Sequence, residues 1–195
     1  MKWTLPNILT VLRLLAAPGV ALMFLYFARP WADWFALVLF VLAALTDFLD
    51  GYLARAWKQE SKIGAMLDPI ADKAMVVIAL MVITGFSGMN PWFLLPATII
   101  MFREVFVSGL REYLGDTAGL LKVTKLAKWK TTAQMVAISI LFSTGAFEHH
   151  ALRDVAFLDY ARHSWYLGVA LLWVASILTF ITGLDYFRKA LPYLK

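Results

Sequence analysis

Four aspartates between positions 47 and 72 are the side chains best suited to chemistry in this chain. Asp47 and Asp50 are three residues apart, and Asp68 and Asp72 are four apart. In helices, the two members of each pair therefore share one face. The surrounding sequence is strongly apolar, and an unpaired ionised group in such surroundings costs several kcal/mol. We therefore predict that two facing helices bring four carboxylates together as a metal site.

Only oxygen ligands are available to that site. The chain has no Cys, and its three His residues are far from the aspartates in the sequence. Carboxylate ligands favour a hard divalent cation, Mg²⁺ or Mn²⁺, over zinc. Gly51 and Gly64 would let a bulky ligand approach the helix backbone. The alternative is that the aspartates are solvated helix ends neutralised by nearby cations, namely Arg55, Lys58, Lys62 and Lys73.

The composition indicates a helical membrane protein. The chain of 195 residues is 62% hydrophobic, has a mean hydropathy of +0.72, and has only 16% charged residues. This is too apolar for a soluble domain of the same size. The absence of Cys excludes disulfides and thiolate chemistry. The net charge of +5 is better explained by anionic lipid head groups and phosphorylated substrates than by nucleic acid, because the basic residues flank apolar segments.

Apolar segments separated by turn signals predict an all-α integral membrane protein with six spans in a single domain, residues 1–195. An amphipathic interfacial segment, residues 3–13, would lead into the first span. The predicted apolar helices cover residues 14–28, 31–56, 64–86, 91–114, 123–147 and 164–187. A polar connection over residues 148–163, with His149 and His150 in a solvated loop, would separate the last two helices.

The N-terminal segment carries its polar residues at helical spacing. Pro6 and Asn7 are typical of a helix start, and Thr10 and Arg13 are three residues apart. We expect these two side chains to direct one polar patch at the level of the lipid head groups. Arg13 alone has an alternative interpretation as a snorkelling anchor.

The distribution of Lys and Arg predicts that both termini are cytoplasmic. In that topology only Arg29, Arg153 and Arg162 lie at the outer side, and all other Lys and Arg residues lie on or near the inside. The polar residues of the helices then also fall at the cytoplasmic side, which predicts one shared site open to cytosol and lipid. A cation transporter is the rival hypothesis, but it would be expected to place ionisable groups near the midplane.

Carboxylates that hold divalent ions beside a group of cations suit phosphoryl or phosphatidyl transfer. Metal ions neutralise phosphate oxygens, and a carboxylate can accept the proton of an attacking hydroxyl. A site of this kind at the membrane surface favours a lipid as one of the substrates.

The whole pattern, D-x2-D-G-x2-A-R-x8-G-x3-D-x3-D, resembles the signature of the CDP-alcohol phosphotransferase family. The resemblance implies six transmembrane helices, usually a homodimer, and two divalent cations. It also implies that an alcohol attacks the pyrophosphate of a CDP-linked lipid with release of CMP. All four aspartates would bind metal, and Asp72 would also be the general base. Contacts with the CDP-lipid would come from Thr10, Arg13, Gly51, Ala54, Arg55 and Ser61.

Sequence outside the pattern is similar to bacterial members of the family whose acceptor is sn-glycerol 3-phosphate. The similarity lies in Pro6-Asn7-Ile8-Leu9-Thr10, Arg103-Glu104, Ser108-Gly109-Leu110-Arg111, Lys128-Trp129-Lys130-Thr131 and Gln134. It implies that Arg103, Arg111 and Lys128 hold the acceptor phosphate, because a dianion needs several fixed cations. Anchoring by the positive-inside rule is the alternative for these three residues. Ala127 departs from the glycine expected before that lysine.

The implied donor is CDP-diacylglycerol, and the implied location is the bacterial inner membrane. Inositol phosphate, serine and phosphatidylglycerol are the alternative acceptors within the family. A cationic acceptor pocket argues against serine but does not separate glycerol phosphate from inositol phosphate.

Overall fold

The computed structural model describes residues 4–57, 61–115, 119 and 126–194, and within them it contains six α-helices and one short 3₁₀ helix. The side chains of residues 48, 50–55 and 126–128 also lie outside the description. The helices are α1 (Leu5–Tyr26), α2 (Trp31–Ala56), α3 (Lys62–Phe86), α4 (Pro91–Leu114), α5 (Leu126–Ala151), α6 (Ala156–Ala190) and η2 (Leu191–Tyr193). The number of helices is therefore confirmed, with α2 and α4 at the predicted bounds, and the six membrane spans stay a prediction.

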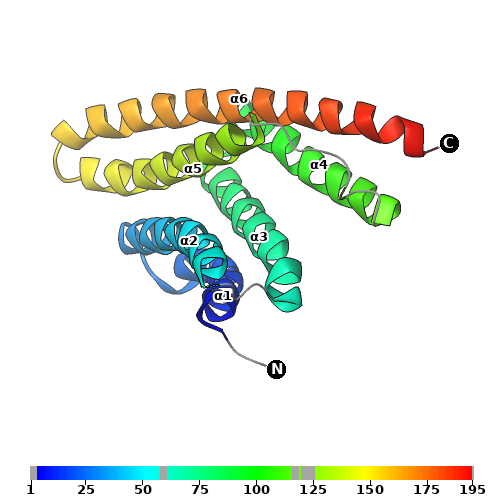
Figure 1. Cartoon of the computed structure of the whole chain (residues 1–195). Coiled ribbons are helices and arrows are strands. Elements are labelled where there is room, and N and C mark those ends of the chain that lie inside the picture. Colours follow the sequence, from blue (N-terminus) through cyan, green and yellow to red (C-terminus); the bar gives the residue numbers. More distant parts are fainter. Residues whose placement is uncertain (1–3, 58–60, 116–118, 120–125, 195) are drawn as a thin grey trace.

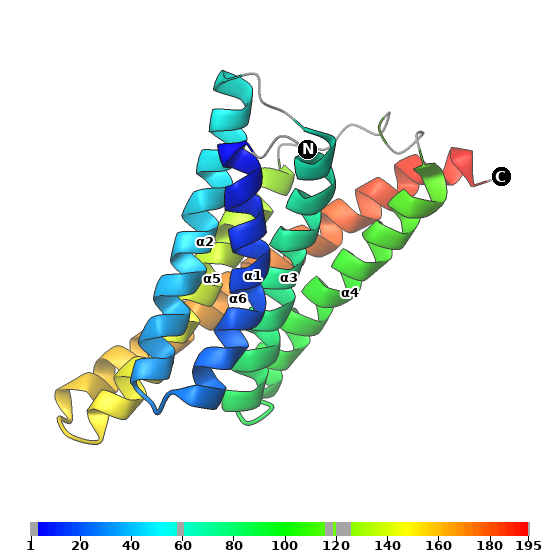
Figure 2. The ribbon, with the colours of Figure 1, turned by 90° about the horizontal axis from the view of Figure 1, so that it is seen from below.

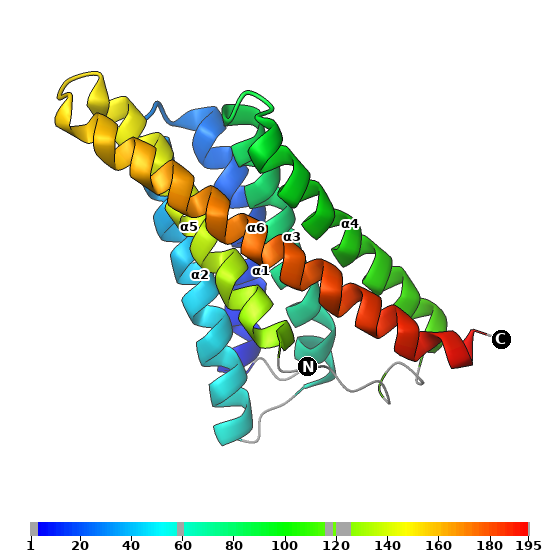
Figure 3. The same ribbon diagram turned by 90° about the horizontal axis from the view of Figure 1, so that it is seen from above.

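The helices form two groups that meet mainly where α2 packs against α5, with smaller contacts of α3 with α4 and α5. In the first group, α1 packs against both α2 and α3 and lies between them (Figure 1). In the second, α6 packs against α5 and α4 and crosses the molecule obliquely (Figures 2 and 3). The turns that follow α1, α3 and α5 lie at one end of the molecule, whereas α1 begins and α6 ends at the other (Figure 2). We call these the turn end and the terminal end.

Three helices of the described chain are long and apolar enough to cross a membrane. They are Leu5–Tyr26, Pro91–Leu114 and the segment Ala156–Tyr193, which joins α6 and η2. Their outer surfaces carry large apolar side chains, such as Leu25 and Phe102, which are 74% and 69% exposed. Such surfaces are favourable in lipid and costly in water. This indicates a membrane protein.

Close helix packing fixes the positions of the polar side chains. The buried core contains Phe40, Leu80, Phe93, Ile138 and Leu172, contributed by five helices. Small residues at the contacts let the helix backbones approach closely, as in other membrane bundles. A Cβ at Gly168 of α6, for example, would lie 2.7 Å from Cγ of Leu141 in α5.

The predicted polar connection over residues 148–163 is wrong for most of its length. Helix α5 continues to Ala151, α6 already begins at Ala156, and His149 and His150 are helical. No Gly or Pro interrupts the helices in this stretch, and polarity alone does not end a helix that leaves the apolar core. The Asp154 carboxylate accepts a hydrogen bond from the backbone N–H of Ala156 (3.0 Å) and so supports the start of α6.

The N-terminal polar patch does not face the lipid head groups as predicted. Helix α1 is continuous from Leu5 to Tyr26, with a proline in its first turn. Thr10 and Arg13 are only 2% and 3% exposed. They are buried because α1 lies between α2 and α3, and their polar groups bond to carboxylates on those helices, as described next.

Candidate active site

Arg13 of α1 joins two of the predicted aspartates. Its Nη1 atom donates hydrogen bonds to Oδ1 of Asp47 on α2 and to Oδ1 of Asp72 on α3. The Arg13 side chain is 2% exposed, whereas the two aspartate side chains are 37% and 39% exposed. The prediction that α2 and α3 face each other directly is therefore corrected: α1 lies between them and supplies the cation that links their carboxylates.

A second residue of α1 holds a third aspartate. The hydroxyl of Thr10 donates to Oδ1 of Asp68 at 2.6 Å. Asp68 lies one turn before Asp72 on α3, and Thr10 lies one turn before Arg13 on α1. The polar face of α1 thus contacts three of the four predicted aspartates. The apolar side chains of Met75 and Met135 close the recess beneath Arg13.

The start of α3 is fastened to α1 through Asn7, to which sequence reasoning assigned no role in the site. Ser61 donates its hydroxyl hydrogen to Oδ1 of Asn7 (2.7 Å) and accepts from the backbone N–H of Gly64 (3.0 Å). It therefore caps α3. A Cβ at Gly64 would lie 2.9 Å from Asn7 Oδ1 and 3.2 Å from Ser61 Oγ, so this close approach requires glycine. An Asn buried in an apolar helix was the available signal.

The recess around Arg13 suits a cation by its chemistry. The described residues contain no group of three or more His, Cys, Asp or Glu side chains at metal-binding distance. The side chain of Asp50 lies outside the described residues. The guanidinium that bridges Asp47 and Asp72 shows that these carboxylates share a position for positive charge. Oxygen donors of this type fit Mg²⁺ or Mn²⁺, and the four-aspartate centre stays a prediction.

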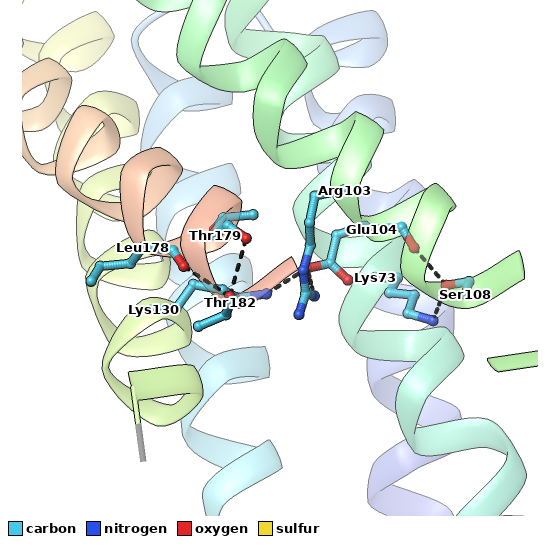
Figure 4. Close-up of polar contacts among 8 residues, drawn as sticks. All are labelled: Lys73, Arg103, Glu104, Ser108, Lys130, Leu178, Thr179 and Thr182. Atoms are coloured by element: carbon cyan, nitrogen blue, oxygen red, sulfur yellow. Dashed lines mark hydrogen bonds and ion pairs between the residues drawn. The ribbon is translucent and has the colours of Figure 1, made fainter. Parts of the chain in front are cut away.

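A second charged cluster surrounds Glu104 of α4. Its Oε1 atom accepts from Nη1 of Arg103 (3.0 Å) and from Nζ of Lys130 on α5 (2.5 Å), as Figure 4 shows. The side chains are largely buried, with exposed fractions of 13%, 16% and 8% for Glu104, Arg103 and Lys130. Nε of Arg103 is buried without a hydrogen-bond partner among the described residues. Two cations thus share one carboxylate, and Nε of Arg103 has no acceptor among the described residues.

Lys73 connects this second cluster to the aspartates. It follows Asp72 directly on α3, and its Nζ donates to the hydroxyl of Ser108 on α4. Ser108 in turn donates to the backbone carbonyl of Glu104 (2.6 Å; Figure 4). Consecutive residues of a helix point about 100° apart. Asp72 and Lys73 therefore direct opposite charges to the two sides of α3, one toward α1 and the other toward α4.

The remaining predicted site residues are only partly placed. Arg111 is exposed and stacks on the ring of Tyr186, with Cζ 5.3 Å from the ring centre. It lies eight residues after Arg103, about 12 Å along the helix axis. The side chains of Gly51, Ala54, Arg55 and Lys128 lie outside the described residues. Sequence reasoning named Lys73 only as a cation that could neutralise the aspartates and assigned no role to Glu104, Ser108 or Lys130, although charged side chains within apolar helices were a signal for three of these four residues.

The family of the chain follows from comparison with known proteins. The model of the CDP-alcohol phosphatidyltransferase family matches residues 3–181. The match covers most of the chain and includes both charged clusters, and the chain therefore belongs to this family.

Individual relatives extend over the full length. A CDP-diacylglycerol–glycerol-3-phosphate 3-phosphatidyltransferase of Cereibacter sphaeroides is 67% identical, across 100% of this chain and 99% of the relative. Proteins with the same name from Rickettsia bellii and Escherichia coli K12 are 40% and 36% identical, each across 97% of this chain and 96% of the relative.

Proposed function

We propose that this protein transfers the phosphatidyl group of CDP-diacylglycerol to sn-glycerol 3-phosphate, giving phosphatidylglycerophosphate and CMP. The observation that carries the proposal is the pair of charged clusters that meet at Asp72 and Lys73. One cluster has an excess of carboxylates, and the other has an excess of cations. The first suits a cation-bridged pyrophosphate, and the second suits an acceptor with a phosphate of its own. The similarity to the named relatives along the whole chain supports the same assignment.

The carboxylate cluster would hold two divalent cations, Mg²⁺ or Mn²⁺, through Asp47, Asp50, Asp68 and Asp72. Bound there, the cations supply neutralisation of the pyrophosphate oxygens and polarisation of the phosphorus. Other residues would contact the CDP-lipid. Thr10 and Arg13 already lie at these carboxylates, next to where the phosphate oxygens would bind. Gly51, Ala54, Arg55 and Ser61 complete the proposed contacts with the CDP moiety, and Ser61 also caps α3.

Asp72 acts as the general base in this proposal. It accepts the proton of the C1 hydroxyl of glycerol phosphate. The hydroxyl oxygen then forms a bond to the phosphorus that carries diacylglycerol. The bond from that phosphorus to the bridging oxygen breaks, and CMP leaves with the electron pair. The partial exposure of Asp72 gives the acceptor access to the carboxylate.

The cation cluster would bind the phosphate of the acceptor. Arg103, Arg111 and Lys128 are the residues expected from the sequence, and the geometry adds Lys73 and Lys130. The unpartnered Nε of Arg103 is a donor ready for a phosphate oxygen. Glu104 keeps Arg103 and Lys130 together and lowers the cost of burying two like charges.

In the membrane, all six helices would span the bacterial inner membrane with the terminal end in the cytoplasm. Helix α1 begins and α6 ends at that end, which agrees with the clustering of Lys and Arg there. The active site would then open to the cytoplasm, where glycerol 3-phosphate is available. A homodimer is proposed from the family resemblance.

Release of CMP by the purified protein tests the proposal. The protein in detergent receives CDP-diacylglycerol and Mg²⁺ or Mn²⁺, with glycerol 3-phosphate, inositol phosphate, serine or phosphatidylglycerol as acceptor. We expect metal-dependent release with glycerol 3-phosphate alone. Release with a different acceptor would keep the chemistry and change the substrate. Absence of release with every acceptor would overturn the proposal and favour a cation transporter.

A further inference from the structure

A cavity lies at the turn end of the molecule, away from both charged clusters of the active site. It has a volume of about 390 Å³ and is lined by the end of α3, the following turn, α5 and α6. Drug-sized and cofactor sites usually begin at about 300 Å³. A smaller recess of about 50 Å³ adjoins it and shares four lining residues with it. The cavity is therefore large enough for a small polar ligand.

The ion pair of Arg29 and Asp33 lines this smaller recess. Arg29 donates to both carboxylate oxygens of Asp33, at 2.8 and 2.7 Å, and the Asp33 side chain is only 3% exposed. The hydrogen bond with Asp33 raises the pKa of Arg29 above its ordinary value. The Arg29 guanidinium also lies over the ring of Phe86, 4.9 Å from its centre. This pair balances its own charge and leaves the wall of the cavity to select a ligand.

The wall carries one charge of each sign. Glu148 of α5 and Arg162 of α6 both line the cavity, and no ion pair joins them in the described chain. Neighbouring residues Asn90, Trp165 and Tyr166 add an amide, an indole N–H and a phenol. Oδ1 of Asn90 accepts from the backbone of Trp92, so its NH₂ group is the part directed to other partners. The cavity therefore offers an acceptor for a cation and several donors for an anion.

Aromatic side chains place this cavity at the level of lipid head groups. Tyr26, Trp31 and Trp92 lie at helix ends next to the turns and are 79%, 63% and 66% exposed. Tyr166, which lines the cavity, is 66% exposed. Exposed Trp and Tyr residues concentrate where hydrocarbon meets the head groups. A phospholipid is thus the ligand that reaches the cavity at this depth.

We propose that the cavity binds the head group of a phospholipid that carries both a primary ammonium and a phosphate. Glu148 accepts hydrogen bonds from the ammonium group. Arg162, with Asn90 and Trp165, donates to the phosphate oxygens. The site is separate from the transfer reaction and, in the topology proposed above, lies in the opposite leaflet from the aspartates.

Native mass spectrometry of the full-length protein tests this site. The purified protein is mixed with equal amounts of phosphatidylethanolamine, phosphatidylcholine and phosphatidylglycerol that have the same acyl chains. We expect about tenfold tighter retention of phosphatidylethanolamine than of phosphatidylcholine, whose trimethylammonium group has no N–H to donate; this equals about 1.4 kcal/mol. Equal retention of the three lipids by the unmodified protein would overturn the proposal without any variant.

Substitutions test the separate roles proposed for Glu148 and Arg162. Glu148→Gln should abolish the preference for phosphatidylethanolamine over phosphatidylcholine, and Arg162→Gln should reduce retention of both lipids about tenfold. Asp159→Asn and Arg153→Gln are matched controls on the same hairpin, because these exposed residues do not line the cavity. CMP release should be unchanged in all four variants, which verifies folding. A preference that persists in Glu148→Gln, or is lost equally in the controls, would contradict the assignment.

Discussion

In the first charged cluster Arg13 contacts two carboxylates, those of Asp47 and Asp72. In the second, on the other side of α3, the carboxylate of Glu104 contacts two cations, those of Arg103 and Lys130. The two clusters have the same size and the opposite imbalance. In the first, Asp68 adds further negative charge through its contact with Thr10. In the second, Lys73 adds further positive charge through its contact with Ser108. Among the described ion pairs, neither cluster has as many charges of one sign as of the other.

This difference distinguishes the charged groups of an apolar bundle that balance one another from those that favour a ligand. A buried ion pair with matched charges needs no ligand, and Arg29 with Asp33 is such a pair. A partly buried cluster with unmatched charges retains part of the desolvation cost of the surplus group. A ligand of opposite sign lowers that cost when it binds. The surplus carboxylates therefore favour divalent cations, and the surplus cations favour a phosphate.

Removal of one carboxylate charge is the most severe test of the anionic cluster. Asp72→Asn keeps the shape of the side chain but removes the proposed base, and we expect CMP release to fall at least about 100-fold. Binding of the CDP-lipid should be largely retained. The control is Asp185→Asn on α6, where the carboxylate pairs with Lys189 at 2.7 Å. Near-normal turnover of Asp72→Asn would exclude this residue as the base.

Loss of one cation tests the opposite cluster. Lys130→Met should raise the KM for glycerol 3-phosphate about 10- to 100-fold, because a hydrogen bond to a charged group contributes about 1.5–3 kcal/mol. The KM for CDP-diacylglycerol should change much less. Steady-state CMP release with each substrate varied separately measures both values. Lys189→Met is the matched control, and similar increases in both KM values would contradict a role specific to the acceptor.

A methyl group at Gly64 tests whether α1 must be fastened to α3. In Gly64→Ala the new Cβ would meet Asn7 Oδ1 at 2.9 Å and disturb the Asn7–Ser61 hydrogen bond. We expect a loss of about 1–3 kcal/mol in the free energy of unfolding, with a several-fold higher KM for CDP-diacylglycerol. Gly85→Ala on the same helix is the control, since nothing lies within 4 Å of its Cβ position. Equal behaviour of the two variants in thermal unfolding and kinetics would refute the argument.

A substitution that disturbs the Arg29–Asp33 pair at the turn end should change the stability of the protein but not its kinetics. In Gly145→Ala the new Cβ would lie 2.1 Å from Arg29 Nη2 and 2.2 Å from Asp33 Oδ1. The pair must then move, and we expect a loss of about 1–3 kcal/mol in the free energy of unfolding. Both KM values should remain unchanged when measured well below the unfolding temperature. A selective change in one KM would show that the two ends of the molecule are coupled.

Helix bounds were predictable wherever turn-forming residues coincide with the end of an apolar run. The turn before Pro91 is such a place, and α4 begins there as predicted. The predicted connection over residues 148–163 was wrong because these residues are polar but include no Gly or Pro, and the helices continue through most of them. Hydropathy reports the environment of a segment, whereas backbone geometry decides where a helix ends.

The site divides in a similar way. The spacing of Asp68 and Asp72 within one helix already predicts that they share a face, and both contact α1. Lys130 was missed because spacing along α5 does not show which lysine meets Glu104; that depends on how α4 and α5 each pack against α6. The position of α1 between α2 and α3 was also not predictable, because it depends on contacts between distant parts of the chain. Spacing within one helix is local information, whereas the choice of partner helix is not.

Because of the length of α6, the thickness of the bilayer affects the tilt of this helix. Its 35 residues extend about 52 Å, whereas the hydrocarbon layer is about 30 Å thick. The helix therefore tilts or extends beyond that layer, and Figure 2 shows its oblique course. A change in thickness is accommodated by a change in tilt. Because a Cβ at Gly183 of α6 would lie 2.9 Å from Cγ of Arg103, the tilt of α6 bears directly on the position of that arginine.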